Sequence, residues 1–280
     1  MADRVLEGKV VLMTGAGRGM GREMSLALAE AGAKVAMIDI DEDVLRAAAR
    51  DAEAAGGQGC ALPIVCDVTD ADRAAAARDE ILSRFGRLDM LVNDAVVGPE
   101  RIGDHFFHDP PKFWQLEDAL WRQMLEVNVY GPQLMARTVV PTMIEAGRGR
   151  IVNVTTSLNT MYRAGAGAYG PSKAALEAHT HIMAHDLDGT GVTANVLIPG
   201  GPVNTRMIPE ASGVDRAQLI QPRVMRDPIV WLCSDDSDGV SGMRFIALRW
   251  DASLPRDERI EAAGAPVAWT QLGAQSVQPD

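Results

Sequence analysis

Short runs rich in valine, isoleucine and leucine alternate with longer, alanine-rich amphipathic stretches along most of the chain. This alternation is typical of βαβ units that surround a buried parallel sheet. Strands are predicted over residues 9–14, 34–38, 59–66, 88–93, 150–155, 193–198 and 245–248. Helices are predicted over residues 21–30, 42–55, 71–85, 119–146, 169–187 and 228–233. The sequence therefore predicts an α/β fold with a doubly wound, parallel, seven-stranded sheet, helices on both faces, and a ligand site beyond the carboxyl ends of the strands.

Two segments depart from this alternation. The chain has 280 residues, enough for one α/β domain and few for two, so we expect a single Rossmann-fold domain over 1–250 and a C-terminal tail over 251–280. Trp269 suggests that part of the tail docks on the domain. Residues 98–118 form an insertion that we expect to line or cover the site, or alternatively to be a surface packing element. Its aromatic and histidine residues are His105, Phe106, Phe107, His108, Phe113 and Trp114.

The charge balance and the cysteines limit the binding partners and the cellular compartment that we expect. Lys and Arg number 27 and Asp and Glu 38, a net charge of −11 that disfavours nucleic acid and anionic membrane surfaces as partners. The sequence has no signal core and no run of about 20 apolar residues, so we expect neither export nor a membrane anchor. Cys60, Cys66 and Cys233 match neither a disulfide framework nor a zinc site, which indicates buried thiols and a cytoplasmic protein. We expect no metal, because His179 and His181 point to different faces of a helix.

A glycine-rich loop, TGAGRGMG over residues 14–21, follows the first predicted strand and opens a helix. A side chain on Gly15 or Gly19 would keep the backbone away from a pyrophosphate, and a Cβ on Gly21 would crowd the helix against the sheet. The free amides of the helix N-terminus bind phosphate. The loop therefore predicts a dinucleotide site.

Asp39 ends the second predicted strand, 24 residues after Gly15. A carboxylate near this offset bonds the hydroxyls of the adenosine ribose, and its charge repels a 2′-phosphate. The alternative is a strand-end aspartate that caps the next helix. We expect NAD, with NADP less favoured, although Arg18 in the loop acts in the opposite sense because it can pair with a 2′-phosphate.

Tyr169 and Lys173 are four residues apart in a predicted helix, so the phenol and the ammonium share one face. We expect the lysine charge to lower the pKa of the tyrosine from about 10 toward the working pH, where the phenol both gives and takes a proton. Thr156 and Ser157 end the fifth predicted strand and offer hydroxyls that can bond a substrate oxygen.

Over residues 9–248 the sequence resembles the short-chain dehydrogenase/reductase family. The segment 14–21 is similar to the family's TGxxxGxG, Cys66-Asp67-Val68 to its adenine-contacting Asp-Val, and residues 93–96 (NDAV) to its NNAG. Asn128 resembles the active-site asparagine, Tyr169 and Lys173 the YxxxK pair, and Pro199-Gly200 with Thr205 the segment that contacts the nicotinamide.

The resemblance implies hydride transfer between a nicotinamide and an alcohol or carbonyl carbon, with Tyr169 as proton donor or acceptor. Lys173 would also bond the nicotinamide ribose, Asn128 would hold a water of a proton relay, and Thr156 or Ser157 would fix the substrate oxygen. It also implies a homodimer or homotetramer that pairs through the helices over 119–146 and 169–187. The cofactor-binding residues that it implies are Gly15, Arg18, Gly19, Met20, Gly21, Asp39, Ile40, Asp67, Val68, Asn93, Ala95, Tyr169, Lys173, Pro199, Gly200, Val203 and Thr205.

The sequence departs from the family pattern in four places. The family's serine lies 13 residues before the tyrosine, which is Thr156 here, whereas Ser157 lies 12 before it; we keep both and slightly favour Ser157 by residue type. Asp94 and Val96 replace residues of NNAG. One extra residue precedes Thr205, and the insertion lengthens the distance between the two motif asparagines.

We therefore expect an NAD(H)-dependent enzyme that interconverts a hydrophobic, cyclic or aryl secondary alcohol and its ketone. Substrate specificity is expected to reside in Phe106, Phe107, Phe113 and Trp114 and in residues 206–227. Two alternatives stay open: a non-redox lyase, epimerase or dehalogenase on the same fold, and a dinucleotide-binding protein without turnover.

Overall fold

The computed structural model describes residues 4–103, 106 and 108–270. Within these residues one sheet has the strand order β3-β2-β1-β4-β5-β6-β7-β8. The strands are β1 (Val10–Thr14), β2 (Lys34–Asp39), β3 (Ala61–Val65), β4 (Met90–Asn93), β5 (Gly149–Val154), β6 (Val192–Ile198), β7 (Met243–Ile246) and β8 (Gly264–Pro266). Neighbours from β3 to β7 are parallel, and helices cover both faces of the sheet. The predicted α/β, doubly wound architecture is confirmed.

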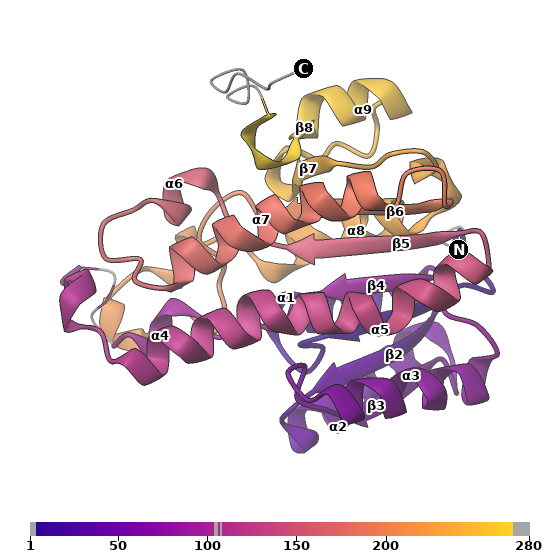
Figure 1. Ribbon diagram of the computed structural model, residues 1–280, viewed down its shortest axis with the longest axis horizontal. Helices are drawn as coiled ribbons and strands as arrows, with labels where there is room; N and C mark the ends of the chain where they lie inside the picture. The colour runs from indigo at the N-terminus through magenta and orange to yellow at the C-terminus, as the bar shows by residue number, and fades with distance from the viewer. Residues whose placement is uncertain (1–3, 104–105, 107, 271–280) are drawn as a thin grey trace, which may run out of the picture.

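The side chains of β1 alternate between two core clusters, as expected for a strand that is buried on both faces. Val11 and Met13 pack with α1, α2 and α8, and Val10 and Leu12 pack with α3, α5 and α7. In Figure 1, α5 and α7 lie across the front of the sheet. The helices are α1 (Gly19–Glu30), α2 (Glu42–Gly56), α3 (Ala71–Phe85), α4 (Asp118–Leu125), a π-helical turn (Glu126–Tyr130), α5 (Gly131–Glu145), α6 (Leu158–Met161), α7 (Tyr169–Asp186), α8 (Arg226–Cys233) and α9 (Arg256–Ala263).

The prediction of seven strands is wrong by one, because part of the expected tail joins the sheet. Residues 256–263 form α9, and β8 pairs antiparallel with β7, with Arg244 opposite Ala265. Val267, which is fully buried, packs with the β6 residues Val196 and Ile198. A strand of three residues is too short to carry an alternating pattern, so periodicity could not predict it. Residues 271–280 of the tail lie outside the described residues.

The chain is helical from 118 to 145, close to the predicted helix over 119–146, but a π-helical turn separates α4 from α5. Pro132 is the physical reason, because proline has no amide to donate to the carbonyl four residues earlier, that of Asn128. The Gly131 amide donates instead to the carbonyl of Glu126. Such turns occur often at functional positions, and Asn128 is fully buried here.

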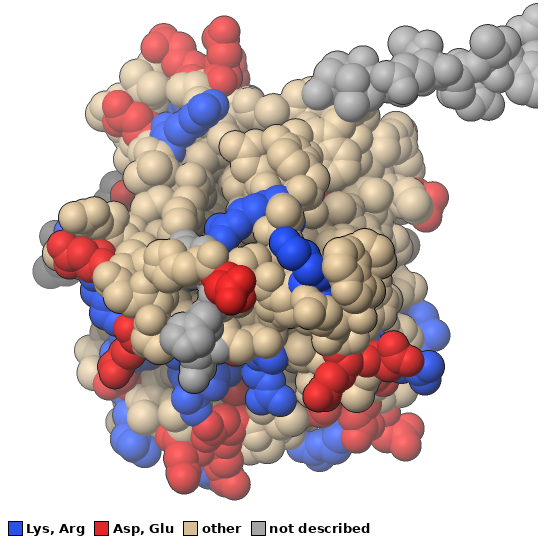
Figure 2. Space-filling model, turned by 90° about the vertical axis from the view of Figure 1, so that its left-hand side faces the viewer, with Lys and Arg blue, Asp and Glu red and all other residues tan. Residues whose placement is uncertain are grey.

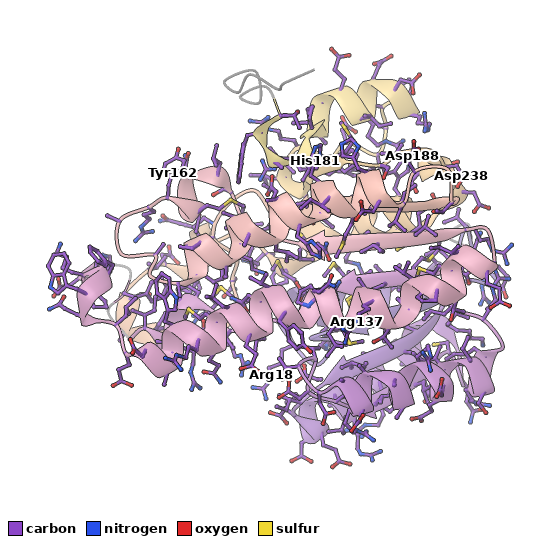
Figure 3. All side chains as sticks on the ribbon, in the orientation of Figure 1. Arg18, Arg137, Tyr162, His181, Asp188 and Asp238 are labelled. Atoms are coloured by element: carbon purple, nitrogen blue, oxygen red, sulfur yellow. The ribbon has the colours of Figure 1, made fainter. Side chains whose placement is uncertain are left out.

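The parallel strands end at one edge of the sheet, toward the left of Figure 1, and Figure 2 views the molecule from that side. Uncharged side chains cover most of the upper part of this face, whereas acidic and basic side chains gather along its lower part. The short helix α6, which the sequence did not predict, lies at this edge. Tyr162 follows α6 and points away from the sheet (Figure 3), and its side chain is 68% exposed.

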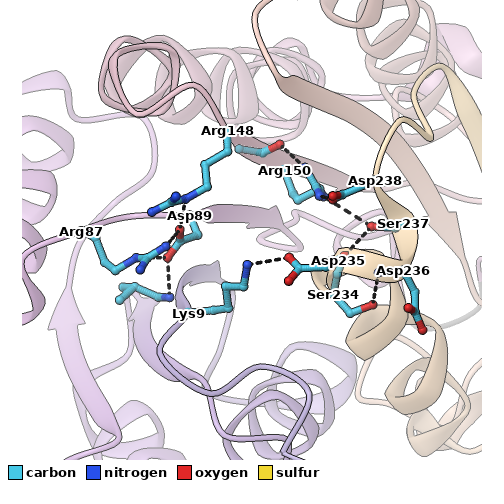
Figure 4. A network of polar contacts seen from close by, with 12 residues as sticks. Lys9, Arg87, Asp89, Arg148, Arg150, Ser234, Asp235, Asp236, Ser237 and Asp238 are labelled. Carbon is cyan, nitrogen blue, oxygen red and sulfur yellow. Dashed lines mark hydrogen bonds and ion pairs between the residues drawn. The ribbon is translucent and has the colours of Figure 1, made fainter.

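A polar network lies at the opposite edge, where the strands begin (Figure 4). Asp89 is buried and accepts hydrogen bonds from the Val10 amide at 2.9 Å and from Nε of Arg87 at 2.8 Å. Nζ of Lys9 lies 2.6 Å from Asp235. Because these groups pair with one another, we expect them to stabilise the fold. The candidate site lies at the other edge.

Among the described residues, no helix combines the length and the apolar character needed to span a membrane. Cys60, Cys66 and Cys233 are free and buried, as their number and spacing predicted. His179 contacts Oε1 of Gln133 at 2.6 Å. In the same residues, no group of three or more His, Cys, Asp or Glu side chains is arranged to hold a metal ion.

Candidate active site

The glycine-rich loop packs tightly against the segment that follows β4. Gly15 has a φ of +66°, and a Cβ there would lie 2.8 Å from the backbone nitrogen and Cα of Ala95. A Cβ on Gly21 would lie 2.1 Å from the carbonyl oxygen of Gly15. Gly19 has a φ of +51° and faces Thr205, whose Cγ2 would lie 3.2 Å from an added Cβ. The protein's own packing therefore requires glycine at 15 and 21.

Asp39 lies beside this loop at the end of β2. Its Oδ2 accepts a hydrogen bond from the Gly17 amide at 3.0 Å, and its Oδ1 accepts one from the Asp41 amide at 3.1 Å. The cap of α2 is Asp41, whose side chain accepts from the Val44 amide. Asp39 is therefore not the helix cap, and Arg18 forms an ion pair with Asp41.

A cavity of about 640 Å³ lies beside these residues. Of the predicted cofactor residues, those that line it are Gly15, Arg18, Gly19, Met20, Asp39, Ile40, Asp67, Val68, Ala95 and Thr205. Other predicted cofactor residues lie outside the lining, as far as the structure describes it: Gly21, Asn93, Tyr169, Lys173, Pro199, Gly200 and Val203. Nδ2 of Asn93 donates to Oδ1 of Asn153 at 2.8 Å, which joins β4 to β5.

The segment that precedes Thr205 keeps this threonine at the cavity despite its extra residue. Val203 forms a bridge with Ile220, and the Asn204 amide donates to the Ile220 carbonyl at 2.8 Å. Gly200 has a φ of +106°, and a Cβ there would lie 2.8 Å from Cβ of Leu248. The loop is thus fixed by residues that are distant in the sequence.

Tyr169 begins α7 and is 7% exposed. The Thr156 side chain lies close enough to its phenol to lower the pKa of Tyr169. Ser157 instead precedes α6, and its Oγ lies 2.9 Å from Oγ1 of Thr160. The structure therefore brings Thr156, at the spacing of 13 residues, to the tyrosine, contrary to the slight preference for Ser157.

We expect Thr156→Val to lower kcat about tenfold, because loss of one hydrogen bond of about 1.4 kcal/mol to the reacting oxygens has this effect on a rate. Ser157→Ala should leave kcat within about twofold, since its hydroxyl bonds Thr160. Steady-state kinetics of the two purified variants compare these effects. A larger loss in Ser157→Ala than in Thr156→Val would reverse the assignment.

The expected lowering of the tyrosine pKa is wrong for the structure. Burial raises the pKa of Tyr169, the charges of Glu100 and Asp94 raise it further, and the nearby Thr156 side chain lowers it. Burial also lowers the pKa of Lys173 to about 8, against the opposing effect of Asp94. The lysine charge therefore acts mainly on the nearby carboxylate rather than on the phenol.

Asp94 is a buried carboxylate where the family motif has an amide. Burial raises its pKa to about 7, while Lys173 and a hydrogen bond from the Gly21 amide lower it and Asp39 raises it. Nζ of Lys173 donates to the Val154 carbonyl at 2.8 Å. The site thus contains a lysine whose charge is partly balanced by a neighbouring acid.

Asn128 lies in the π-helical turn and joins three elements. Its Oδ1 accepts from the Val97 amide at 2.8 Å, and its Nδ2 donates to the Val97 carbonyl and to Oγ of Ser172, each at 3.0 Å. Its side chain therefore fixes the segment after β4 against α7. Its role in a proton relay stays a prediction.

Glu100 and Arg101 of the insertion over 98–118 line the cavity, as expected for this segment, but its described aromatic residues do not. Phe113 and Trp114 are 75% and 69% exposed, their rings lie 5.0 Å apart, and Phe106 is buried. These three described aromatic residues are absent from the cavity wall. Phe107 and His105 lie outside the described residues. Pro110 and Leu116 of the insertion pack against the glycine-containing segment 165–167 that precedes Tyr169.

Other side chains form the wall near Tyr169. Val96, Val97 and Met207 line the cavity and pack in one apolar cluster with Tyr169. Glu100 and Arg101 of the insertion and Arg206 of the expected specificity segment also line the cavity, together with Gln123 and Val127, which no sequence motif indicated. Val97 directly follows the NDAV motif, which is the available signal, and Met207 falls in the range 206–227 where specificity is expected.

The residues at the cavity fit a nicotinamide dinucleotide. The N-terminus of α1 borders the cavity and, as far as the structure describes it, has no acidic residue in its first turn and no side-chain cap. Its amides can therefore hold a pyrophosphate. Asp39 can accept from ribose hydroxyls. Cys66, Asp67 and Val68, which resemble the family's adenine-contacting segment, also line the cavity.

Comparison with known proteins agrees with this geometry. The family model described as short chain dehydrogenase matches residues 9–213. Fluoren-9-ol dehydrogenase from Terrabacter sp. is 31% identical over 261 residues, which cover 87% of this chain and 72% of that protein. A metagenomic short-chain oxidoreductase in complex with NADP is 29% identical, with a TM-score of 0.70, over 86% of this chain and 97% of that one. The 3-ketoacyl-(acyl-carrier-protein) reductase from Brucella melitensis, complexed with NADH, is 27% identical, with a TM-score of 0.72, over 84% of this chain and 95% of that one.

Proposed function

Because the chain belongs to the short-chain dehydrogenase/reductase family and is an NAD(P)-dependent oxidoreductase acting on CH–OH groups, we propose that it interconverts a hydrophobic secondary alcohol and its ketone with NAD(H). The observation that carries this proposal is the buried pair Tyr169 and Lys173 on α7, with the Thr156 side chain close enough to the phenol to lower its pKa. Tyr169 supplies a proton donor, and Thr156 supplies a hydroxyl, beside the apolar wall of the cavity.

In this proposal Tyr169 is the general acid and base. Burial raises its pKa, so the phenol is protonated at neutral pH, the form that donates a proton to a ketone oxygen. Thr156 would hold the same oxygen, and the Lys173 ammonium would bond the nicotinamide ribose. The bound nicotinamide supplies or accepts the hydride. Fixed donors are effective because they already face the oxygen on which negative charge develops.

Two observations support a hydrophobic substrate. Val96, Val97 and Met207 form the cavity wall that packs with Tyr169. A relative at 31% identity is named for the oxidation of fluoren-9-ol, a fused-ring secondary alcohol. These observations favour a cyclic or aryl ketone over a small polyol.

Two further contacts support NAD over NADP. Asp39 lines the cavity with both carboxylate oxygens held by backbone amides, so its negative charge stays in place. Arg18, the cation that would favour a 2′-phosphate, is paired with Asp41. A 2′-phosphate would therefore meet a fixed carboxylate and an arginine that is already engaged.

A titration with NADH and NADPH, followed by energy transfer from protein to nicotinamide, tests this preference. We expect NADH to bind at least about tenfold more tightly, a difference of about 1.4 kcal/mol. Asp39→Asn should improve NADPH binding, since it removes the charge and keeps the shape. Glu42→Gln removes a carboxylate of α2 outside the cavity lining, as far as the structure describes it, and serves as the matched control. Tighter NADPH binding by the parent protein would contradict the proposal.

The substrate part is tested separately with fluoren-9-one and dihydroxyacetone as paired ketones, by the loss of nicotinamide absorbance. Faster reduction of the fused-ring ketone is expected. A preference for dihydroxyacetone would contradict the hydrophobic substrate and leave the cofactor result intact.

We also propose that the protein is a homo-oligomer in the cytoplasm. Leu125, Val129, Tyr130 and Ala175 line an open hollow between the helices named for pairing, and Tyr130 is partly exposed there. The free thiols support a reducing compartment. Sedimentation velocity of the purified chain tests the assembly, and a monomer at micromolar concentration would contradict it.

A further inference from the structure

The helix that carries the tyrosine presents three polar residues on one face. Tyr169, Lys173 and Glu177 follow one another at intervals of four residues, about one helical turn each. Nζ of Lys173 donates to the carbonyl of Val154, the last residue of β5, at 2.8 Å. Oε2 of fully buried Glu177 accepts from Oγ1 of Thr155 at 3.1 Å. Two successive residues at the end of β5 are thus bound by α7.

The next residue, Thr156, is bound from a different element. Arg244 of β7 donates from Nη2 to the Thr156 carbonyl at 3.2 Å, and its Nε lies 2.7 Å from Oε1 of Glu177. The Arg244 side chain is largely buried. Arg244 therefore joins Glu177 to the backbone of the residue whose side chain lowers the pKa of the phenol.

The C-terminal segment pairs with the strand that carries Arg244. Strand β8 pairs with β7, and Ala265 lies opposite Arg244 in the register. Val267, which follows β8, is fully buried. Residues 264–267 thus lie along the strand that carries Arg244. A buried ion pair interacts more strongly than an exposed one because water screens it less.

We propose that Glu177 and Arg244 are positioning residues, which hold the Thr156 hydroxyl against the Tyr169 phenol by fixing the backbone of residues 155–156. Neither residue touches the reacting atoms in this proposal. It rests on the proposed function of Thr156 and Tyr169 and adds two residues that none of the sequence motifs contains.

The test must separate positioning from stability, because removing one partner leaves a buried charge unpaired. Arg244→Lys keeps the charge opposite Glu177, but a lysine ammonium lacks the planar fork that reaches two acceptors at once. Glu177→Gln combined with Arg244→Met removes both charges and keeps an acceptor for Thr155. Thermal unfolding and NADH titration identify the variants that are folded and bind the dinucleotide like the parent.

In the folded variants we expect kcat to fall about tenfold, the effect of one lost hydrogen bond, with KM and the NADH Kd within about twofold. The basic limb of the pH profile should also move to higher pH, since Thr156 lowers the pKa of Tyr169. On a Thr156→Val background the same changes should lower kcat little further. The effects of residues that act through Thr156 do not add to the effect of removing its hydroxyl.

Three results would overturn the proposal. One is a folded variant with the parent kcat and pH profile. Another is a loss that adds in full to that of Thr156→Val. The last is a fall in stability of Arg244→Lys with unchanged kcat in its folded fraction, which would leave the ion pair a purely structural role. Retention of activity in Tyr169→Phe would instead contradict the proposed function itself.

Discussion

Tyr169→Phe should lower kcat for both ketone reduction and alcohol oxidation by about 10³-fold, within the range of about 10²–10⁴ for loss of a general acid or base. The phenol hydroxyl is the group whose pKa the nearby Thr156 lowers, and phenylalanine keeps the ring while it removes the proton. The ring is buried and packs in the cluster with Met124 and Ala168, so folding should be retained. Steady-state kinetics and an NADH titration of the same preparation measure the two effects.

Tyr162→Phe is the matched control. Tyr162 is 68% exposed, points away from the sheet, and donates its hydroxyl to Oδ1 of Asn159 at 2.6 Å (Figure 3). The same chemical change there should leave kcat within about twofold, as for most exposed substitutions. If Tyr169→Phe retained more than a tenth of the parent kcat, Tyr169 would not be the general acid or base.

Gly15→Ala should weaken NADH binding by about 100-fold or more, equivalent to about 2.7 kcal/mol. Two effects combine at this position. The φ of +66° disfavours an L side chain by about 1–2 kcal/mol, and the added Cβ would lie 2.8 Å from the backbone of Ala95. Since backbone atoms cannot rotate away, the loop must move from the segment after β4, and the amides at the start of α1 must move with it. NADH titration measures the loss.

Gly147→Ala separates the effect of backbone strain from the effect of a steric contact such as that with Ala95. Gly147 has nearly the same φ, +65°, but a Cβ there meets no described atom within 4 Å. We expect about 1–2 kcal/mol of lost stability from the backbone strain and an unchanged NADH Kd. Equal losses of NADH binding in both variants would show that strain alone explains the effect of Gly15→Ala.

The cofactor half of the site was the part most accessible to sequence reasoning. The loop over 14–21 and Asp39 are recognisable because a tight turn into a helix restricts the residue types at each position. The structure brings Gly15, Gly19 and Asp39 to one cavity. Asp94 and Val96 depart from the family's NNAG motif. In the structure Asp94 lies near Lys173 and Val96 lies on the cavity wall.

The substrate half was less accessible. The aromatic composition of 98–118 suggested a pocket lining, yet Phe113 and Trp114 face solvent. Composition does not state which way a side chain points, and this direction depends on the segments against which the insertion packs. The pairing of Glu177 with Arg244 joins residues 67 positions apart, a separation over which no local pattern carries information.

The sequence by itself determined the α/β architecture, the dinucleotide loop and the positions of Tyr169 and Lys173, because periodicity and motif spacing are local properties of the chain. Only the tertiary structure decided that Thr156 rather than Ser157 meets the phenol, that Arg18 is engaged by Asp41, and that burial raises the tyrosine pKa. Each of these outcomes depends on burial or on a contact with a residue of another element. Burial and such contacts exist only once the chain has folded.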